Sequence, residues 1–212
     1  MEIKKFQFNP FPVNTYVVWD NASKECAIID PGCYWQEELD ELQQFIAANG
    51  LSVKYILLTH LHLDHALAVP AVKKLYGAPF MANKKDAFLL QNAKQQAASY
   101  GLRLQDEPIE IDGDIQEGDI FHLGNEEIEV LEVPGHSPGS VVFYLPQDKK
   151  MIVGDVLFRQ SIGRTDLPGG NHQTLLDGIQ KKLFTLPLDT VVYSGHGPET
   201  SIGYEKDFNP FF

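Results

Sequence analysis

The order of predicted elements indicates an α/β fold built of two similar halves. Each half reads as strands, a turn with an acidic residue, a helix or loop, and a strand that ends in a histidine. The segment 27–32 resembles 151–155 in this turn, and 58–60 resembles 193–196 in its final histidine. Because no linker or low-complexity segment interrupts the 212 residues, we expect one domain, 1–212, with one substantial core.

Short apolar runs between Gly, Pro, Asn and Asp residues predict the strands. The run 55–58 is apolar enough for a strand that is covered on both faces. The strands are expected at 2–8, 13–20, 26–29, 55–58, 119–123, 126–133, 140–145, 150–154 and 190–193.

Apolar residues at helical spacing predict four helices, the last of them near the C-terminus. In the first helix Leu39, Leu42 and Ile46 fall on one face, and Gly50 ends it. Pro70 stands early enough in the second to be tolerated in the first turn. The third is either a surface helix or a flap that borders the active site. The helices are expected at 35–49, 66–76, 85–100 and 171–185.

Directly after the strand 55–58 the chain places four potential metal ligands within six residues. His60 and His62 are two apart, so in extended backbone they project to the same side. Asp64 and His65 are adjacent and point differently. One loop can therefore hand two histidines to one metal, and a carboxylate with a histidine to a second. Imidazole and carboxylate ligands suit zinc, iron or manganese. The alternative is a polar loop whose histidines are solvated and bind no metal.

Three further potential ligands recur in the same local setting. His136, Asp155 and His196 each stand where a predicted strand ends, beside glycine or proline. Functional residues concentrate on such loops because strands hold them rigidly and glycine lets the backbone turn sharply. This recurrence favours a metal site over solvated side chains. His122 and His172 lie outside this pattern and are expected to be structural.

With these residues in view, the chain resembles the metallo-β-lactamase superfamily. The resemblance rests on His60-x-His62-x-Asp64-His65, followed by His136, Asp155 and His196. Residues 8–11, 14–16, 154–158, 161–166 and 195–198 resemble the small glyoxalase II-like (hydroxyacylglutathione hydrolase-like) hydrolases in particular. The resemblance implies a four-layer αββα sandwich of two pseudo-symmetric halves with metals at one edge. The sequence departs from the family at 66–68, where Ala-Leu-Ala replaces the usual glycines.

The resemblance also implies two divalent metal ions. In the family pattern one metal has the ligands His60, His62 and His136; the other has Asp64, His65 and His196, and Asp155 bridges. We expect zinc, with iron or manganese as alternatives. A metal-bridging hydroxide is then the nucleophile, and Asp64 is the catalytic residue placed to orient it. A related site with cysteine at the bridging position typically belongs to a zinc β-lactamase, so Asp155 at that position points away from antibiotic hydrolysis.

The implied function is a metal-dependent thioester hydrolase of the S-acylglutathione type. A mononuclear iron persulfide dioxygenase using His60, His136 and Asp155 is the alternative, since it shares the fold and a Gly-Arg-Thr-Asp-like segment. A lactone or other ester hydrolase is also open. Glyoxalase II has a helical C-terminal region that helps to hold glutathione, whereas this chain ends at Phe212. We therefore expect weak specificity for glutathione.

The loop 161–170 follows the bridging aspartate. Arg164 and Asp166 are expected to form a salt bridge that shapes this loop, with substrate contact as the alternative. Arg159 is a weaker candidate for contact with an anionic substrate. The segment 8–11, Phe-Asn-Pro-Phe, is repeated at 208–211, and the sequence alone does not explain the repeat.

Composition limits the classes of partner. The net charge of −12 and pI near 4.9 argue against a nucleic-acid partner, which calls for a basic face. Cys26 and Cys33 form no disulfide framework, which fits a reducing compartment, and we expect Cys33 to be the more exposed. No apolar signal core or membrane-length run is present. We expect a cytoplasmic protein with a small-molecule substrate and no nucleic-acid, membrane or obligate protein partner.

Overall fold

The structure, a computed structural model, describes residues 1–104 and 109–212. The strands are β1 (Glu2–Phe8), β2 (Val13–Trp19), β3 (Glu25–Ile29), β4 (Ser52–Leu57), β5 (Phe80–Ala82), β6 (Gly113–Asp114), β7 (Ile120–Leu123), β8 (Glu126–Glu132), β9 (Val141–Leu145), β10 (Lys150–Gly154), β11 (Leu157–Phe158), β12 (Ser161–Ile162), β13 (Val191–Ser194) and β14 (Thr200–Ser201). The helices are α1 (Gln36–Ala48), α2 (Leu63–Ala66), α3 (Val69–Tyr76), the 3₁₀ helix η1 (Lys84–Leu90), α4 (Ala93–Ser99), α5 (His172–Gly178), the π-helix η2 (Ile179–Leu183) and α6 (Ile202–Phe208).

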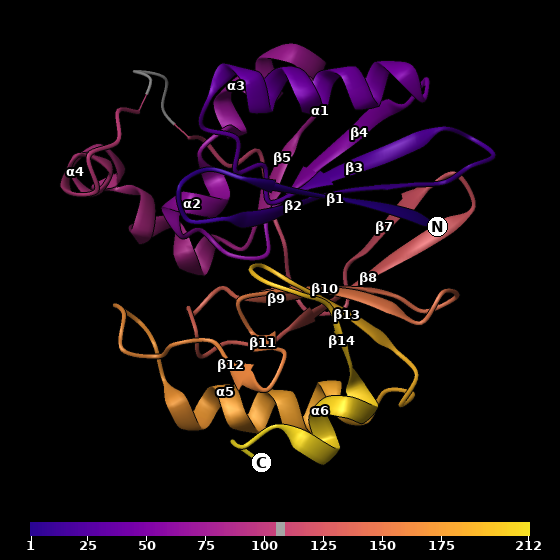
Figure 1. The fold of residues 1–212 in the computed structure, drawn as a ribbon, viewed down its shortest axis with the longest axis vertical. Helices are drawn as coiled ribbons and strands as arrows, with labels where there is room; N and C mark the ends of the chain where they lie inside the picture. The colour runs from indigo at the N-terminus through magenta and orange to yellow at the C-terminus, as the bar shows by residue number, and fades with distance from the viewer. Residues whose placement is uncertain (105–108) are drawn as a thin grey trace.

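Two six-stranded sheets face each other, and helices cover their outer faces (Figure 1). The first sheet has the order β1-β2-β3-β4-β5-β6, with α1 and α3 outside it. The second has the order β14-β13-β10-β9-β8-β7, with α5 and α6 outside it. The four-layer αββα sandwich expected from the resemblance is therefore confirmed.

The two sheets contain the same crossover, which matches the doubling seen in the sequence. In the first, β3 leads through α1 to a parallel β4; in the second, β10 leads through α5 and η2 to a parallel β13. Asp30 and Asp155 each follow the first strand of the crossover, and His60 and His196 each follow the second. Because parallel strands end at the same edge of a sheet, these four residues are carried toward one edge of the sandwich.

Three hydrophobic cores hold the layers together, and the alternation of side chains along each strand divides residues among them. In β3, Cys26 and Ile28 pack with Leu42 of α1, whereas Ala27 and Ile29 belong to the core between the two sheets. A third core joins the second sheet to α5, η2 and α6. Strands buried on both faces therefore read as nearly continuous apolar runs in the sequence.

The helix expected at 66–76 is instead two helices. α2 contains Asp64 and His65 of the metal-ligand motif, and the chain breaks at Leu67 and Ala68 before α3 begins. Pro70 stands in the first turn of α3, where its missing N–H leaves no helical bond unmade. The proline therefore marks the start of a new helix.

The helix expected at 85–100 is also two pieces, η1 and α4. An amphipathic helix here would bury Phe88 and expose Asp86, but Asp86 is fully buried whereas Phe88 is 38% exposed. The carboxylate of Asp86 accepts hydrogen bonds from the neighbouring loops. Because these bonds require Asp86 to point inward, a short 3₁₀ helix forms here in place of an amphipathic helix.

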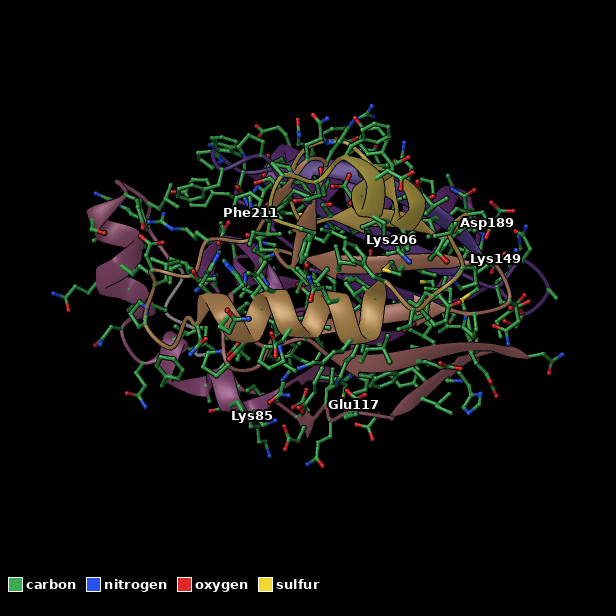
Figure 2. All side chains as sticks on the ribbon, turned by 90° about the horizontal axis from the view of Figure 1, so that it is seen from below. Lys85, Glu117, Lys149, Asp189, Lys206 and Phe211 are labelled. Carbon is green, nitrogen blue, oxygen red and sulfur yellow. The ribbon has the colours of Figure 1, made fainter. Side chains whose placement is uncertain are left out.

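Near the C-terminus the expected helix at 171–185 continues from α5 into the π-helix η2, and α6 follows as a further helix that was not expected. Figure 2 views this helix-covered face from below, with Lys149 and Asp189 side by side near one end. Their amine and carboxylate are 2.7 Å apart.

No helix within residues 1–104 and 109–212 combines the length and apolar character that crossing a bilayer would need.

Cys33 is the more exposed of the two cysteines, as expected, but the difference is only 5% against 0% and both are buried. Both pack in the core between the first sheet and its helices.

Candidate metal centre

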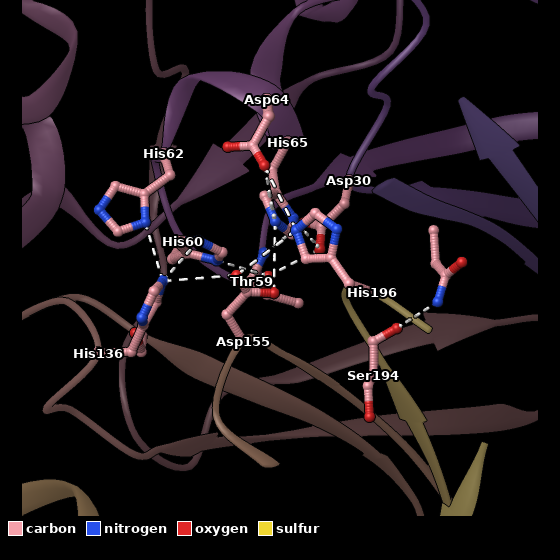
Figure 3. Close-up of polar contacts among 12 residues, drawn as sticks. Asp30, Thr59, His60, His62, Asp64, His65, His136, Asp155, Ser194 and His196 are labelled. Carbon is pink, nitrogen blue, oxygen red and sulfur yellow. Dashed lines mark hydrogen bonds and ion pairs between the residues drawn. The ribbon is translucent and has the colours of Figure 1, made fainter. Parts of the chain in front are cut away.

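All seven predicted ligand residues lie together at one edge of the sandwich (Figure 3). The loops that supply them follow β4, β8, β10 and β13, so rigid strands from both sheets set their positions. Three groups have ligand atoms within 4.8 Å of one another: His60, His62 and His136; His60, His65 and Asp155; Asp64, His65 and His196.

The first group consists of three imidazoles from two loops. Nδ1 of His62 is 2.9 Å from Nε2 of His136, which in turn is 3.3 Å from Nε2 of His60. Ligands about 2.0–2.1 Å from a tetrahedral zinc are about 3.3 Å from one another. The nitrogens are therefore spaced as the ligands of a single divalent ion would be.

The group of Asp64, His65 and His196, called the second group from here on, combines a carboxylate with imidazoles, and the set of His60, His65 and Asp155 connects it to the first. Oδ2 of Asp64 lies 3.4 Å from Nε2 of His196 and 3.8 Å from Nε2 of His65. Asp155 stands between the groups: Oδ1 is 3.5 Å from Nε2 of His65, while Oδ2 is 3.6 Å from His196 and 3.7 Å from His136. One carboxylate thus faces ligand atoms of both groups.

Buried atoms without partners show that this cluster fits divalent cations. Nε2 of His65 and Oδ1 of Asp155 are buried, and the structure gives neither a hydrogen-bond partner. Buried polar atoms are nearly always satisfied, so such atoms call for an explanation. Imidazole nitrogens and carboxylate oxygens pointing into one space are the donor set that zinc, iron and manganese take.

The two groups differ in their electrostatics. Burial lowers the pKa of His62 to about 4, with a contribution from His136, and burial holds the pKa of His60 well below its usual value. Burial acts in the same sense on His65, but Asp64 and Asp155 outweigh it and raise its pKa. For Asp155, burial favours the protonated form, yet His65 lowers its pKa. His60 and His62 of the first group are thus neutral imidazoles, whereas Asp64 and Asp155 are ionised carboxylates.

Hydrogen bonds on the outer ring nitrogens orient three of the histidines. Nδ1 of His136 donates to the carbonyl of Arg164 at 2.8 Å, and Nδ1 of His60 is 3.1 Å from Oγ1 of Thr59. Nδ1 of His65 donates to Oδ2 of Asp30 at 3.0 Å. Each bond leaves Nε2 to face the cluster, as outer partners of metal-binding histidines do.

Asp30 is a site residue that sequence reasoning treated only as part of a turn. It is fully buried and also accepts bonds from Thr59, 2.8 Å from N and 2.7 Å from Oγ1. It therefore fixes the start of the ligand loop as well as the ring of His65. The similarity between 27–32 and 151–155 was the signal that could have identified it, since it pairs Asp30 with Asp155.

Asp86 is a second residue that the sequence did not reveal. Its carboxylate accepts bonds from N of Leu61 at 3.2 Å, Oγ of Ser137 at 2.6 Å and N of Gly139 at 2.6 Å. It ties the loop of His60 and His62 to the loop of His136. No local pattern marks it, because all three partners lie in other segments.

A pocket of about 330 Å³ opens over the cluster. Gln96 and Tyr100 line it, so the segment 85–100 borders the site, as the flap interpretation expects. Arg164 lines it too and makes the predicted salt bridge, with Nε and Nη2 each 2.7 Å from Asp166. Its other walls are Phe11, Leu63 and Leu167 beside the ligand residues.

The remaining candidates lie away from this pocket. The guanidinium of Arg159 lies over the ring of Tyr204, 4.8 Å from its centroid. His122 is exposed near Glu127, and His172 is exposed as the first residue of α5. Neither histidine is part of the ligand groups.

Comparison with known proteins identifies the family. Residues 8–196 match the Metallo-beta-lactamase superfamily, and the chain belongs to this family of metal-dependent hydrolases. The chain is 40% identical to hydroxyacylglutathione hydrolase GloC of Haemophilus influenzae, over 100% of this chain and 98% of that protein. It is also 40% identical to the probable metallo-hydrolase YqgX of Bacillus subtilis, over 100% of this chain and 97% of that one.

Solved structures agree on the fold. The BLEG-1 B3 metallo-beta-lactamase is 38% identical with a TM-score of 0.88, covering 99% of each chain. TTHA1623 in a di-iron-bound form is 35% identical with a TM-score of 0.86, covering 99% of this chain and 100% of that one. ETHE1 from Myxococcus xanthus is 28% identical with a TM-score of 0.80, covering 99% of this chain and 84% of that one. The fold implies divalent metal binding, and the names of these proteins point to different chemistries.

Proposed function

We propose that this chain is a binuclear metal-dependent hydrolase of thioesters, of the glyoxalase II-like type. The position of Asp155 carries the proposal. Its two carboxylate oxygens face His65 on one side, and His136 and His196 on the other, at 3.5–3.7 Å. Two cations that share this carboxylate would use all seven clustered ligand residues, whereas one tetrahedral zinc uses four at most.

In this proposal His60, His62 and His136 hold one cation, and Asp64, His65 and His196 hold the other. Bound there, the two divalent ions would supply an activated water as nucleophile and stabilise negative charge on the substrate oxygen. The neutral state of His60 and His62 suits ligation, because a protonated imidazole has no lone pair to donate.

Asp64 is the proposed catalytic residue. Burial favours its protonated form, but His65 and a hydrogen bond from His196 lower its pKa, so it is ionised at neutral pH. Oδ2 faces those two histidines, which leaves Oδ1 to accept a hydrogen bond from the attacking water. The side chain is 22% exposed at the pocket, where substrate would enter.

The pocket supports a small-molecule acyl substrate. Its volume suits a short acyl group, and Phe11, Leu63, Tyr100 and Leu167 supply apolar surface around the reacting centre. The hydroxyacylglutathione hydrolase name of the Haemophilus influenzae relative supports a thioester of the S-acylglutathione type. We propose zinc as the metal, with iron as the alternative that the di-iron neighbour suggests.

One observation favours a second candidate, a mononuclear iron persulfide dioxygenase. Nε2 of His136 lies 3.3 Å from Nε2 of His60 and 3.7 Å from Oδ2 of Asp155, so a two-histidine, one-carboxylate set is available. The likeness to ETHE1 adds weight to this candidate.

Metal analysis combined with activity assays separates the two. We expect about two zinc ions per chain, and cleavage of thioesters without oxygen and with zinc as the only metal. Replacing Asp155 by Ala should remove the shared ligand and lower kcat more than about 100-fold, beyond the usual effect of losing an outer partner of a ligand.

Three results would count against the proposal. Full activity of Asp155→Ala would exclude the bridging role. Oxygen consumption with glutathione persulfide, lost when zinc replaces iron, would favour the dioxygenase. Hydrolysis of a cephalosporin in preference to thioesters would place the chain with the BLEG-1 neighbour.

A further inference from the structure

The turn between β1 and β2, residues 9–12, and the start of β2 lie against two of the clustered ligand loops. Nδ2 of Asn9 donates to the carbonyl of Asp64 at 3.0 Å and to that of Gly32 at 2.8 Å. Nδ2 of Asn14 donates to the carbonyls of Ser194 at 2.9 Å and Gly197 at 3.0 Å, on either side of His196. One asparagine of the turn and one at the start of β2 therefore hold the backbone at two proposed ligands from one metal group.

These two are the most exposed of the proposed ligands. The side chains of Asp64 and His196 are 22% and 29% exposed, against 0% for His65 and 3% for His136. His60, His65 and His136 also have a bond on the outer ring nitrogen, whereas the described part of the chain gives none for His196. Backbone bonds from the turn and the start of β2 supply the restraint that burial and outer bonds supply elsewhere.

Asn9 is itself held in one orientation. Its backbone N donates to Oε1 of Glu38 at 2.7 Å, and its Oδ1 accepts from N of Phe11 at 2.8 Å. Its φ of 58° is in the left-handed region, which asparagine tolerates better than most residues. A Cβ on Gly32 would stand 2.9 Å from both Nδ2 of Asn9 and the carbonyl of Asp64, so only glycine permits this approach.

Asn14 is part of a wider contact with the loop of His196. Its backbone N donates to the carbonyl of Gly195 at 2.7 Å, and Oη of Tyr16 donates to the carbonyl of Ser194 at 2.6 Å. Val13 forms an isolated β-bridge with His196. The loop is therefore bonded to β2 at consecutive residues, and Asn14 adds the bond beyond the histidine, at Gly197.

We propose that Asn9 and Asn14 are positioning residues for the second metal of the pair, acting through the backbone of Asp64 and His196. The role rests on the binuclear function proposed above. It is selective, because neither asparagine bonds to His60, His62 or His136 among the described residues. Loss of either side chain should weaken the second metal and spare the first.

The repeated Phe-Asn-Pro-Phe segment supplies an internal control, because the asparagine of each copy is buried and bonds a backbone carbonyl far along the chain. Asn209 is buried like Asn9, 4% against 6% exposed. Its side chain also makes three bonds: from Nδ2 to the carbonyl of Ser161 at 3.0 Å and to Oε2 of Glu205 at 2.8 Å, and from N of Phe211 to Oδ1 at 3.2 Å. In both copies the asparagine bonds a distant backbone carbonyl, but only in the first copy does that carbonyl belong to a proposed metal ligand.

Zinc titration of metal-free protein against a chromophoric chelator tests the role. We expect wild type to bind two equivalents. Asn9→Gly, which keeps the positive φ unstrained, and Asn14→Ala should keep the first affinity and lose about 10- to 100-fold in the second. Asn14→Ser, whose hydroxyl can still donate, should lose less. Asn209→Gly should lose comparable thermal stability and keep both affinities.

The outcomes separate this role from the function on which it rests. Two unchanged affinities in both Asn9→Gly and Asn14→Ala would overturn the positioning role alone. Equal weakening of both metals, or the same loss in Asn209→Gly, would show a general effect on stability and would also overturn it. A single equivalent in wild type would overturn the binuclear function and the role with it.

Discussion

At the scale of single residues, neighbours decide how each histidine of the cluster can be used. His60 and His62 lie among other imidazoles in a buried place, so their pKa values fall and they stay neutral. His65 is just as buried but faces three carboxylates, so its pKa rises instead. Identical side chains within one loop thus reach different charge states through what the folded loops place around them.

Burial also fixes the state of the two cysteines. It raises the pKa of Cys26 to about 12 and also raises that of Cys33, so both are protonated thiols near neutral pH. Since the thiolate is the reactive form, we expect a thiol-specific chromogenic reagent at about pH 8 to modify neither cysteine in native protein. Both should react in denaturant. Rapid native labelling of one thiol would show that Cys33 is reached from solvent after all.

At the scale of elements, the sequence predicts strands and ligand loops better than helix boundaries. The runs 126–133 and 150–154 were predicted within a residue because apolar periodicity is local. The helices at 66–76 and 85–100 were predicted too long, since Pro70 starts a new helix and Asp86 turns inward to bond other loops. The ligand motif was visible in the sequence, whereas Asp86 and Asn14 depend on partners far along the chain.

Asp86 gives a prediction about pH. Burial raises its pKa above the usual 3.8, more than the bonds it accepts lower it. The contribution of this carboxyl to stability is therefore fully present below that value and is lost as the pH rises through the folded pKa. In urea denaturation of metal-free protein, the stability advantage of wild type over Asp86→Asn should shrink from acid to neutral pH.

Asp112 provides the control with the opposite sign. Lys73 and the N of Phe80 donate to it and lower its pKa, so its contribution is present above the unfolded pKa and is lost as the pH falls. The advantage of wild type over Asp112→Asn should grow toward neutral pH. The same slope in both variants would contradict the assignment for Asp86.

At the scale of the whole molecule, three cores hold the sandwich without the cluster, so metal removal should loosen the protein and leave it folded. An ion at about a thousand times its dissociation constant stabilises by about 4 kcal/mol. For a chain of this length the two proposed ions together, about 8 kcal/mol, correspond to about 20 °C in Tm. We expect chelation to lower Tm by this amount, two equivalents of zinc to restore it, and Asp155→Ala to respond less. Complete unfolding on chelation would contradict this.

The charge of the molecule bears on the proposed substrate, a glutathione thioester, which is an anionic and flexible ligand. The net charge is −12, and Arg164 is the one lysine or arginine among the described residues that line the pocket. Asp166 already binds it through two 2.7 Å bonds. The residues proposed to act on the thioester lie in the metal-ligand loops, so turnover should be measurable. KM should be high, because the contacts that are missing are those that would bind the ground state and the transition state equally.

The substitution Asp166→Asn tests this account. It frees the guanidinium of Arg164 to bind the anionic substrate, so KM for lactoylglutathione should fall while kcat stays unchanged. The fall should be only a few fold, because an exposed ion pair contributes little binding energy. KM for a short neutral thioester should not move, and Asp189→Asn, which breaks the exposed pair with Lys149 elsewhere, should change neither. Steady-state kinetics on both substrates measures this. A low-micromolar KM in wild type that rises steeply when the γ-glutamyl group is removed would instead reveal a glutathione site formed by other contacts.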